Sequence, residues 1–520
     1  MCGILGYIGD RGPYEVICNG LKAVEYRGYD SVGVYAGKIL KKVGDVDSFL
    51  KNLDRNLSMP IIAHTRWATH GKVEDKNAHP HEYGDVILVH NGTVDLPPFP
   101  NLKSDTDSER IAAYLHNMEG SFLDRLKNLN LNGTYALVIF YKKDKDKLYF
   151  AKKDIPLIIG IGNNEMFLSS DIAAFIDYTT KYIRLEDGDY GYITKNEYKI
   201  YNKGMEVKRE IKEYDKKQDA KKGNFPHFML KEIHDQLELL PEIISQKIPE
   251  DVFDILKNNR IDVIAAGSSY NAGLFIKYLT NYDLSVYISS EYSYLMRNPE
   301  YLLAISQSGE TLDTIKAVKL AKSKGAKIIS ITNYLGSTLA SLSDFIIPLG
   351  VGIEKGVAAT KTFFSTILVG YKLINKINIE KIKTAILEGM NKNVEIVDQD
   401  SKIFFLGKGI NYPIALEGAL KFKELVYCHA EGLPAGEMKH GPLSLFDKQA
   451  YVLFIKSEDS IYNYEEIKAR GARVNLIDFS NEYPQISTLV YFQRLAYHNA
   501  VYRNQDPDKP RFLAKSVTVE

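Results

Sequence analysis

The stretch Val263-Ile-Ala-Ala-Gly267 ends a short apolar run, and a helical pattern follows it from about Tyr270. A similar stretch, Ile403-Phe-Phe-Leu-Gly407, comes later in the chain and precedes a helical pattern from about Tyr412. Short apolar runs that alternate with helices are typical of buried parallel strands. The pattern therefore predicts two similar α/β domains in tandem, each with a doubly wound parallel sheet. Further strands are expected at Tyr301–Ile305, Lys327–Thr332, Tyr451–Ile455 and Val474–Phe479.

The first 200 or so residues have a different pattern. Short apolar strands such as Ile4–Ile8 and Ile61–His64 are separated by turn residues, and helical stretches are expected near Pro13–Glu25 and Asp107–Leu115. This predicts an α+β layered fold. A connector is expected at Met205–Lys222, because twelve of its 18 residues are charged. The predicted domains are residues 2–210, a charged linker 211–225, two α/β domains at 226–380 and 381–505, and a tail 506–520.

The composition is that of an ordinary globular protein, with 45% hydrophobic and 25% charged residues in a chain of 520. Lys plus Arg and Asp plus Glu number 66 each, so the charge balance favours neither a nucleic acid nor a membrane surface as a partner. Three scattered cysteines predict neither disulfides nor a zinc site and fit a reducing compartment. With no signal peptide or spanning segment recognised, we expect a cytoplasmic protein.

Cys2 directly follows the initiator methionine. Removal of Met1 would leave Cys2 with a thiol nucleophile and a free α-amine, whose ordinary pKa of about 7.7–8.0 suits it as the base. The alternative is an accidental cysteine near a frayed terminus.

Three segments offer groups that complete a site around Cys2. Arg66, in His64-Thr-Arg-Trp-Ala-Thr-His-Gly71, suits a carboxylate, although it also fits an exposed strand end. Asn91-Gly92 supplies an amide and an N–H for an oxyanion hole, or marks a turn. The acidic run Ser104–Glu109 resembles a helix start, and one of its carboxylates suits an ammonium group. Together these groups are what hydrolysis of the glutamine amide requires.

The later part of the chain holds two further candidate sets. Ser306-Gln-Ser-Gly-Glu-Thr311 lies between a strand and a helix and suits a phosphate monoester, or is an ordinary capped loop. Ala266-Gly-Ser-Ser269 ends an earlier strand of the same sheet, so the two loops are expected to converge. Glu417, Lys421 and Glu424 share one helix face, as a surface salt-bridge stripe or a proton-transfer set. His440 is a turn histidine or an acid–base group.

These motifs, with Glu25-Tyr-Arg-Gly-Tyr-Asp-Ser31 and Leu513-Ala-Lys-Ser-Val-Thr-Val-Glu520, resemble those of the glutamine–fructose-6-phosphate aminotransferase (isomerizing) family, also called glucosamine-6-phosphate synthases. The resemblance covers nearly the whole chain in collinear order. It implies a class II glutamine amidotransferase domain of the N-terminal-nucleophile fold, followed by two sugar-isomerase domains. The implied activity is transfer of the glutamine amide nitrogen to fructose 6-phosphate, giving glucosamine 6-phosphate and glutamate, the first step of hexosamine biosynthesis.

The resemblance also implies residue roles. Cys2 attacks glutamine, Asn91 and Gly92 form the oxyanion hole, and Trp67 resembles the gate of an internal ammonia channel. In the sugar site, Lys515 forms a Schiff base, Glu424 moves the C1–C2 proton with Lys421 as a second transfer group, and His440 opens the sugar ring from the partner subunit of a homodimer. No metal or organic cofactor is expected. Implied glutamine contacts are Arg66, Trp67, Thr69, His70 and Asp107; implied fructose 6-phosphate contacts are Ser269, Ser306, Gln307, Ser308, Thr311, Val357 and Ala514.

The chain departs from the family pattern at three places. A short Pro-rich run, Leu96–Pro100, stands where the family has a longer helical stretch, and Ala359 replaces a common serine. The second isomerase domain looks trimmed between Ile455 and Val490. Two rival functions are a sugar-amine deaminase or deglycase that uses no glutamine, and a non-catalytic sugar-phosphate sensor. The complete glutaminase set disfavours the first, and the lack of a basic DNA-binding segment disfavours the second.

Overall fold

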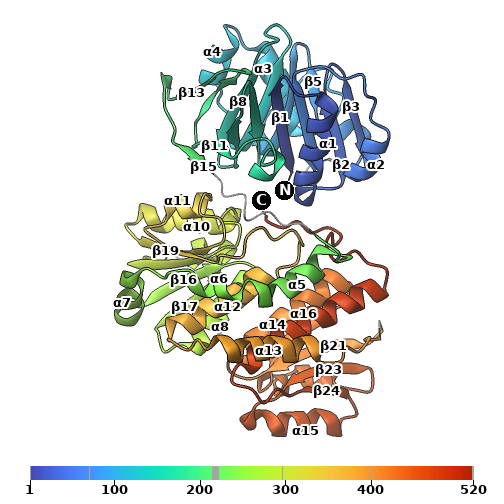
Figure 1. Cartoon of the computed structure of the whole chain (residues 1–520), viewed down its shortest axis with the longest axis vertical. Helices are drawn as coiled ribbons and strands as arrows, with labels where there is room; N and C mark the ends of the chain where they lie inside the picture. Colours follow the sequence, from blue (N-terminus) through green and yellow to red (C-terminus); the bar gives the residue numbers. More distant parts are fainter. Residues whose placement is uncertain (1, 69–70, 214–221, 296, 399, 518–520) are drawn as a thin grey trace. The chain divides into compact units, whose positions relative to one another are not determined.

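In the computed structural model the chain folds as two units (Figure 1). Unit 1 comprises residues 1–217 together with 516–520, and unit 2 comprises residues 218–515. The structure describes residues 2–68, 71–213, 222–295, 297–398 and 400–517. Among these residues, no helix combines the length and the apolar character needed to cross a membrane.

Unit 1 is built on two antiparallel sheets. The first runs, in spatial order, β15 (Ile211–Glu213), β11 (Lys181–Arg184), β9 (Ile158–Ile161), β10 (Glu165–Ser169), β1 (Gly3–Gly9), β4 (Ile61–Arg66), β2 (Ser31–Tyr35) and β3 (Ile39–Val43). The second runs β14 (Met205–Glu206), β13 (Tyr198–Asn202), β12 (Tyr190–Ile193), β8 (Leu148–Lys153), β7 (Asn132–Tyr141), β6 (Val86–Asp95) and β5 (His81–Tyr83).

Alternating side chains on β1 explain how these sheets stack. Ile4 and Ile8 pack into a core shared with the second sheet, whereas Leu5 and Tyr7 pack against α1 (Pro13–Val24) and α2 (Val46–Lys51) on the other face. The outer face of the second sheet packs in the same way against α3 (Asp107–Asn117) and α4 (Phe122–Lys127). The result is a helix–sheet–sheet–helix sandwich, in agreement with the predicted α+β layers.

Two expectations for unit 1 need correction. Asn91-Gly92 is no turn: both residues lie inside β6, where Asn91 pairs with Ala136 and Gly92 with Tyr135 of β7. The segment predicted as a connector begins with strand structure, because β14 pairs with β13 and β15 with β11. Three residues of the predicted linker 211–225 are therefore part of the first sheet. Its positions 214–221 lie outside the described residues.

Unit 2 contains two parallel sheets, as predicted. The first has the order β17 (Leu284–Ile288), β16 (Ile261–Ala265), β18 (Tyr301–Ile305), β19 (Lys327–Thr332) and β20 (Phe345–Pro348). The second has the order β22 (Ala430–Pro434), β21 (Lys402–Gly407), β23 (Ala450–Ile455) and β24 (Arg473–Ile477). We call the parts built on these sheets the first and second halves of unit 2. The similar stretches noted in the sequence form β16 and β21, the equivalent strands of the two sheets.

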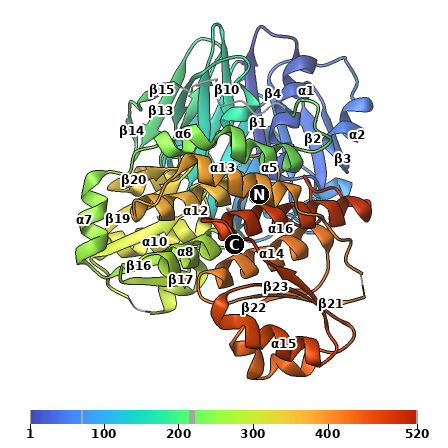
Figure 2. The same ribbon diagram turned by 60° about the horizontal axis from the view of Figure 1, so that its bottom comes forward.

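A large apolar core joins the helices of both halves. α14 and α16 lie side by side in unit 2 (Figures 1 and 2). The second sheet has one strand fewer than the first, which agrees with the trimmed sequence. The helices of unit 2 are α5 (Phe228–Glu238), α6 (Leu240–Ser245), α7 (Glu250–Asn258), α8 (Ser268–Leu279), α9 (Ser289–Tyr292), α10 (Leu312–Ser323), α11 (Thr338–Leu342), α12 (Lys361–Leu373), α13 (Ile379–Asn391), α14 (Asn411–Val426), α15 (Ile461–Ala469) and α16 (Pro484–Tyr502).

Candidate functional site

The Cys2 thiol lies at the start of β1, beside the end of β4. The backbone N–H of Trp67 donates to Cys2 Sγ over 3.2 Å, and Sγ lies 3.5 Å from the Trp67 carbonyl oxygen. These two contacts hold the sulfur atom against the Trp67 backbone. The Cys2 carbonyl oxygen accepts from Arg27 Nε over 3.4 Å, so the backbone of the nucleophile is held as well.

Asn91 and Gly92 lie on β6 next to Cys2. The Asn91 Nδ2 group donates to the Cys2 carbonyl oxygen over 2.7 Å. Gly92 has φ of +127°, and a Cβ atom there would lie 2.1 Å from the Thr134 carbonyl oxygen. Only glycine fits this position, because neither the φ nor the space admits a side chain. The structure thus brings together the predicted nucleophile and the predicted oxyanion-hole residues.

The predicted glutamine-binding groups lie around Cys2. Arg66 is the last residue of β4 and is buried. Burial lowers the pKa of its guanidinium, and electrostatic interaction with Cys2 and Asp107 opposes this effect. Asp107 is the first residue of α3, and its carboxylate accepts from the Val94 N–H over 2.9 Å. Thr69 and His70 were also predicted to bind glutamine, and both lie outside the described residues.

Four buried histidines surround this site. The rings of His64 and His79 stack with centroids 4.1 Å apart, and His81 meets His79 edge-on at 4.6 Å. His90 Nδ1 lies 3.0 Å from Ser108 Oγ on α3. Burial lowers the pKa of His64 to about 3 and those of His79 and His81 well below the ordinary value, because a charged imidazole loses its hydration there. His64, His79 and His81 are therefore neutral at physiological pH.

In unit 2 the loop Ser306–Thr311 connects β18 to α10, as predicted. Ser306 Oγ accepts from the Gly309 N–H over 3.1 Å and lies 3.1 Å from Thr311 Oγ1 at the helix start. Gly309 has φ of +61°, and a Cβ there would lie 2.0 Å from Ser337 Oγ. The loop presents hydroxyl and N–H groups at the N-terminus of a twelve-residue helix, an arrangement that suits a phosphate.

The acidic and basic stripe of α14 is buried, so it is not a surface salt-bridge stripe. Lys421 and Glu417 are each 1% exposed, and Lys421 Nζ contacts the carboxylates of Glu417 and Glu424. Burial alone would lower the pKa of Lys421, but these two carboxylates outweigh it and raise the pKa above the ordinary value. The predicted set of Lys421 and Glu424 is thus one coupled ionic group.

This ionic group also contacts the first half of unit 2. Ser268 Oγ donates to Glu417 Oε1 over 2.9 Å and lies 3.2 Å from Lys421 Nζ, and Asn271 Nδ2 donates to Glu417 Oε2 over 2.9 Å. Ser268 begins α8 and directly precedes Ser269, the predicted sugar contact. The carboxyl end of β16 and the face of α14 are therefore joined.

Lys515 in the tail lies in a second buried ionic group. Its ammonium bonds to the Glu354 carboxylate and to the Gly356 carbonyl oxygen at 2.7 Å. Burial alone would raise the pKa of Glu354, but the charge of Lys515 and hydrogen bonds from Lys515 and Thr362 lower it to about 2.

Glu232 on α5 belongs to the same buried group. Its Oε1 accepts from the Gly356 N–H over 3.2 Å, so the Gly356 peptide lies between Glu232 and Lys515. Glu232 is 1% exposed, and its Oε2 has no hydrogen-bond partner among the described residues. Burial and the neighbouring Glu354 charge raise the pKa of Glu232 to about 7, against the opposing effects of Lys515 and Lys361.

The remaining predicted residues make fewer contacts with the groups described above. The Val357 N–H donates to the Asp508 carbonyl oxygen, and Ala514 is part-buried beside Lys515. His440 is exposed, and its ring has no hydrogen-bond partner in the part of the chain that the structure describes. No group of three metal-binding side chains converges within the described ranges.

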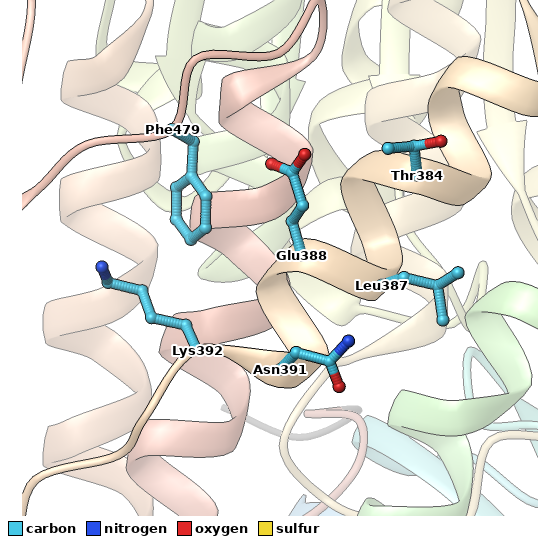
Figure 3. A pocket seen from close by; sticks show the side chains of 6 residues that line it. All are labelled: Thr384, Leu387, Glu388, Asn391, Lys392 and Phe479. Atoms are coloured by element: carbon cyan, nitrogen blue, oxygen red, sulfur yellow. The ribbon is translucent and has the colours of Figure 1, made fainter.

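A surface hollow in unit 2 contains none of these groups (Figure 3). Its Lys392 ammonium lies 5.2 Å from the centre of the Phe479 ring, and its Glu388 carboxylate accepts from Asn481 over 2.5 Å. Lys392 thus contacts Phe479, and Glu388 contacts Asn481. We assign no reaction step to this hollow. The lining residues are Thr384, Leu387, Glu388, Asn391, Lys392 and Phe479.

Comparisons with known proteins agree with this geometry. A family model described as the SIS domain matches residues 254–376 and 395–484, which contain both parallel sheets. A glutamine–fructose-6-phosphate aminotransferase (isomerizing) of Pyrococcus horikoshii is 40% identical over 601 aligned positions that cover all of both chains. The protein of that name from Fusobacterium nucleatum is 37% identical over 608 positions, again covering both chains fully. The chain belongs to the glutamine–fructose-6-phosphate aminotransferase (isomerizing) family.

A solved structure supports this membership for unit 2. The C-terminal domain of glucosamine-fructose-6-phosphate aminotransferase from Francisella tularensis superposes with a TM-score of 0.50 and 30% identity. The match covers 56% of this chain and all of that domain. The prediction of two sugar-isomerase domains is therefore confirmed.

The sequence analysis of this family member missed several buried residues. His79, His81, Glu232 and Glu354 gave no signal, because isolated His and Glu residues in loops and helices look like solvated side chains. Ser268 precedes the predicted sugar contact Ser269, but no role was predicted for Ser268 itself. Its partner Glu417 was predicted only as a member of the charged face of one helix. The contact of Ser268 with Glu417 joins residues 149 positions apart, which no local pattern reveals.

Proposed function

We propose that this chain catalyses the reaction for which its family is named, with the two half-reactions divided between its units. The enzyme transfers the amide nitrogen of glutamine to fructose 6-phosphate and isomerises the ketose, giving glucosamine 6-phosphate and glutamate. The observation that carries the proposal is that unit 1 places Asn91 against Cys2, while unit 2 holds the Lys421–Glu424 and Lys515–Glu354 ion pairs.

Unit 1 is proposed to be the glutaminase, a class II amidotransferase of the N-terminal-nucleophile fold. Once Met1 is removed, the Cys2 amine takes the thiol proton and Sγ attacks the amide carbon of glutamine. Asn91 Nδ2 and the Gly92 N–H then stabilise the oxyanion, while Arg66 binds the substrate carboxylate and Asp107 its ammonium. Collapse of the tetrahedral intermediate releases ammonia and leaves a thioester, which water hydrolyses to glutamate.

The ammonia must reach the sugar as the neutral molecule. In neutral water most ammonia is protonated, and ammonium is not a nucleophile. A passage that excludes water keeps it neutral, because a charged ion is costly to bring into an apolar environment. Following the family resemblance, we propose Trp67 as the gate of that passage.

Unit 2 is proposed to bind the phosphate of fructose 6-phosphate at Ser306–Thr311, with Ser269, Val357 and Ala514 against the sugar. The Lys515 amine attacks C2 of the open-chain ketose, loses water and forms a Schiff base. Because Lys515 is paired with Glu354, it must first lose a proton. After ammonia replaces the lysine at C2, Glu424 takes the proton from C1 and returns it to C2, with Lys421 as the second transfer group.

Ring opening is assigned to a histidine of a second chain. His440 is exposed, as the family pattern of a His440 supplied across a homodimer interface requires. A His440→Ala chain mixed with a Lys515→Ala chain should recover activity in the mixed dimer, whereas each variant alone should be inactive. Mixing that restores nothing would overturn the shared site.

Isotope transfer tests the whole proposal. The enzyme receives fructose 6-phosphate, glutamine labelled with ¹⁵N in the amide, and a large excess of unlabelled ammonium. Glucosamine 6-phosphate should carry the label, as mass spectrometry would report. Mainly unlabelled product would show that the two sites are not coupled, and no product with glutamine would favour the deaminase or sensor alternatives.

A further inference from the structure

The side chain of Asn91 is engaged at both ends. Its Nδ2 donates to the Cys2 carbonyl oxygen over 2.7 Å, and its Oδ1 lies 3.0 Å from His64 Nε2. A carboxamide oxygen can only accept a hydrogen bond, so the proton of this second bond belongs to His64 Nε2. The Asn91 carboxamide has nearly the same shape when its oxygen and its NH₂ group exchange places, and this bond distinguishes the two orientations.

His64 is held so that it presents this one proton. The ring is 1% exposed on β4, where His64 pairs with Ile4 of β1, two residues from the nucleophile. One face of the ring stacks on His79 with an interplanar angle of 22°. A neutral imidazole carries one N–H, and the bond to Asn91 Oδ1 requires that hydrogen to be on Nε2.

The stack extends toward the predicted glutamine site. His79 meets His81 edge-on at 70°, and His81 Nε2 lies 3.1 Å from Thr106 Oγ1. Thr106 is the N-cap of α3, whose first residue is Asp107. The same neutral imidazoles thus connect the Asn91 amide to the helix that carries Asp107.

We infer that His64 is a positioning residue that fixes the orientation of the Asn91 amide, so that its NH₂ group and not its oxygen faces the reacting carbonyl. This inference rests on the proposed role of Asn91 in the oxyanion hole. A flipped Asn91 would set a carbonyl oxygen against the oxyanion, where it repels the charge that a donor would stabilise. Loss of one oxyanion-hole donor lowers kcat by about 10²–10³-fold.

The test compares substitutions that differ only in the hydrogen-bond donor. His64→Phe keeps an aromatic ring for the stack on His79 but removes the donor, and His64→Gln supplies an amide N–H near the position of Nε2. We expect His64→Phe to lower kcat for glutamine hydrolysis by about 10²-fold with little change in KM, since the oxyanion forms only in the transition state. His64→Gln should recover most of that loss.

His116→Phe is the matched control, because His116 lies in unit 1 on α3 and its ring contacts the Asp85 N–H and the Tyr83 ring instead of Asn91. It should hydrolyse glutamine normally. Fructose 6-phosphate isomerisation, which uses unit 2, should be unchanged in all of these variants and reports that the chain is folded. If His64→Phe does not fold, His64→Met gives the same contrast with His64→Gln, because methionine also lacks a donor.

A double-mutant cycle separates this inference from the proposed function. In an Asn91→Ala background, His64→Phe should cause no further loss, because His64 acts through Asn91. A His64→Phe enzyme with normal kcat, or a His64→Gln enzyme as slow as His64→Phe, would overturn the positioning role. An Asn91→Ala enzyme with normal hydrolysis would instead overturn the oxyanion role of Asn91 itself.

Discussion

The two units bury different kinds of polar group around their reactive residues. In unit 1, the Asn91 amide bonds to Cys2 and to His64, a buried imidazole whose pKa is lowered to about 3, and the charged groups nearby include Arg66 and Asp107. In unit 2, the reactive residues belong to charged groups: Lys421 with two carboxylates on α14, and Lys515 with Glu354. The difference is one of chemistry: a neutral imidazole–amide pair in unit 1 and ion pairs in unit 2.

The difference follows from what each reaction needs. Amide hydrolysis develops charge on one oxygen for a short time, and fixed neutral dipoles stabilise it without themselves titrating. Isomerisation moves protons between carbon atoms and needs groups that change protonation state. Buried charges are tolerated only in pairs, because an isolated ion loses its hydration. The ion pairs of unit 2 therefore fit the proposed acid–base chemistry.

A second comparison lies within unit 2, between the loops that follow equivalent strands. After β18 the loop Ser306–Thr311 presents hydroxyl and N–H groups. After β23 the corresponding Lys456–Ser460 loop contains Glu458 and Asp459, and Ser457 Oγ donates to Asp459 Oδ1. A carboxylate at that point repels a phosphate. This difference supports the proposal that the first half binds the phosphate, while the second half contributes the ionic face of α14.

Replacing Cys2 by alanine should separate the two units most completely. Without the sulfur nucleophile, glutamine hydrolysis and glutamine-dependent synthesis should fall by about 10⁴-fold or more. Isomerisation of fructose 6-phosphate should continue, because unit 2 is intact. Cys18→Ala, in the same unit, serves as the control. Loss of both activities in Cys2→Ala would argue that the units are not chemically separate.

Lys515→Ala should have the complementary effect. Synthesis should fall by about 10³-fold or more because no Schiff base can form, in the range that loss of a reacting group produces. Glutamine hydrolysis by unit 1 should continue, measured as glutamate release without sugar turnover. An unchanged synthesis rate would remove Lys515 from the mechanism. Borohydride trapping with fructose 6-phosphate should label the wild-type chain at Lys515 and leave the variant unlabelled.

Lys421→Met should reveal the cost of buried charge in unit 2. The substitution keeps the length of the side chain but leaves Glu417 and Glu424 without their cation, so unfolding should become easier by about 3–5 kcal/mol. Lys423→Met is the control, because Lys423 is exposed on the same helix and its loss should change the free energy of unfolding by less than about 0.5 kcal/mol. Equal denaturation midpoints for the two variants would contradict the buried ion pair.

Of these substitutions, Glu232→Gln should change the free energy of unfolding least, and the change should depend on pH. Glu232 has a pKa of about 7 in the folded protein, above the value of about 4.3 for an unfolded chain. The folded state therefore holds the proton more tightly, and this contribution to stability is complete below pH 4.3 and lost as pH rises through 7. The variant should gain stability relative to wild type at pH 8.5 compared with pH 5.

Thermal unfolding at the two pH values measures this gain. Glu238→Gln, at an exposed position of the same helix, should show no pH-dependent difference from wild type. A Glu232→Gln curve parallel to that of wild type across this range would show that Glu232 does not ionise between pH 5 and 8.5.

Local patterns predicted much of the fold but not the buried groups. β16 and β21 were recognised because apolar runs, Gly and a following helix are neighbours in sequence. Asn91-Gly92 was expected as a possible turn because that dipeptide favours turns, yet ten residues of β6 pair with β7 and keep it extended. The charges at 211–213 suggested a connector, although β15 is an edge strand where charged residues are common.

The candidate site was also predicted only in part. The residues at the chain ends and in the motif loops could be recognised because they are adjacent in sequence. Lys515 and Glu354 are 161 residues apart, and His64 and Asn91 are 27 apart on strands of different sheets. Such pairings depend on the packing of whole layers. Neither the burial that neutralises His64 nor the Lys515 charge that ionises Glu354 can be inferred from the residues on either side of them.

The hydrogen bonds of Ser268 to the α14 residues bear on whether the chain can be produced as two separate fragments. A break in the chain between residues 376 and 395 would give two fragments, each with its own sheet. Glu417 and Lys421 would then lose the serine and asparagine that solvate them, and α8 would present uncovered polar groups at its own surface. Neither fragment should be soluble by itself, and activity should return only when both are synthesised together and assemble as they fold.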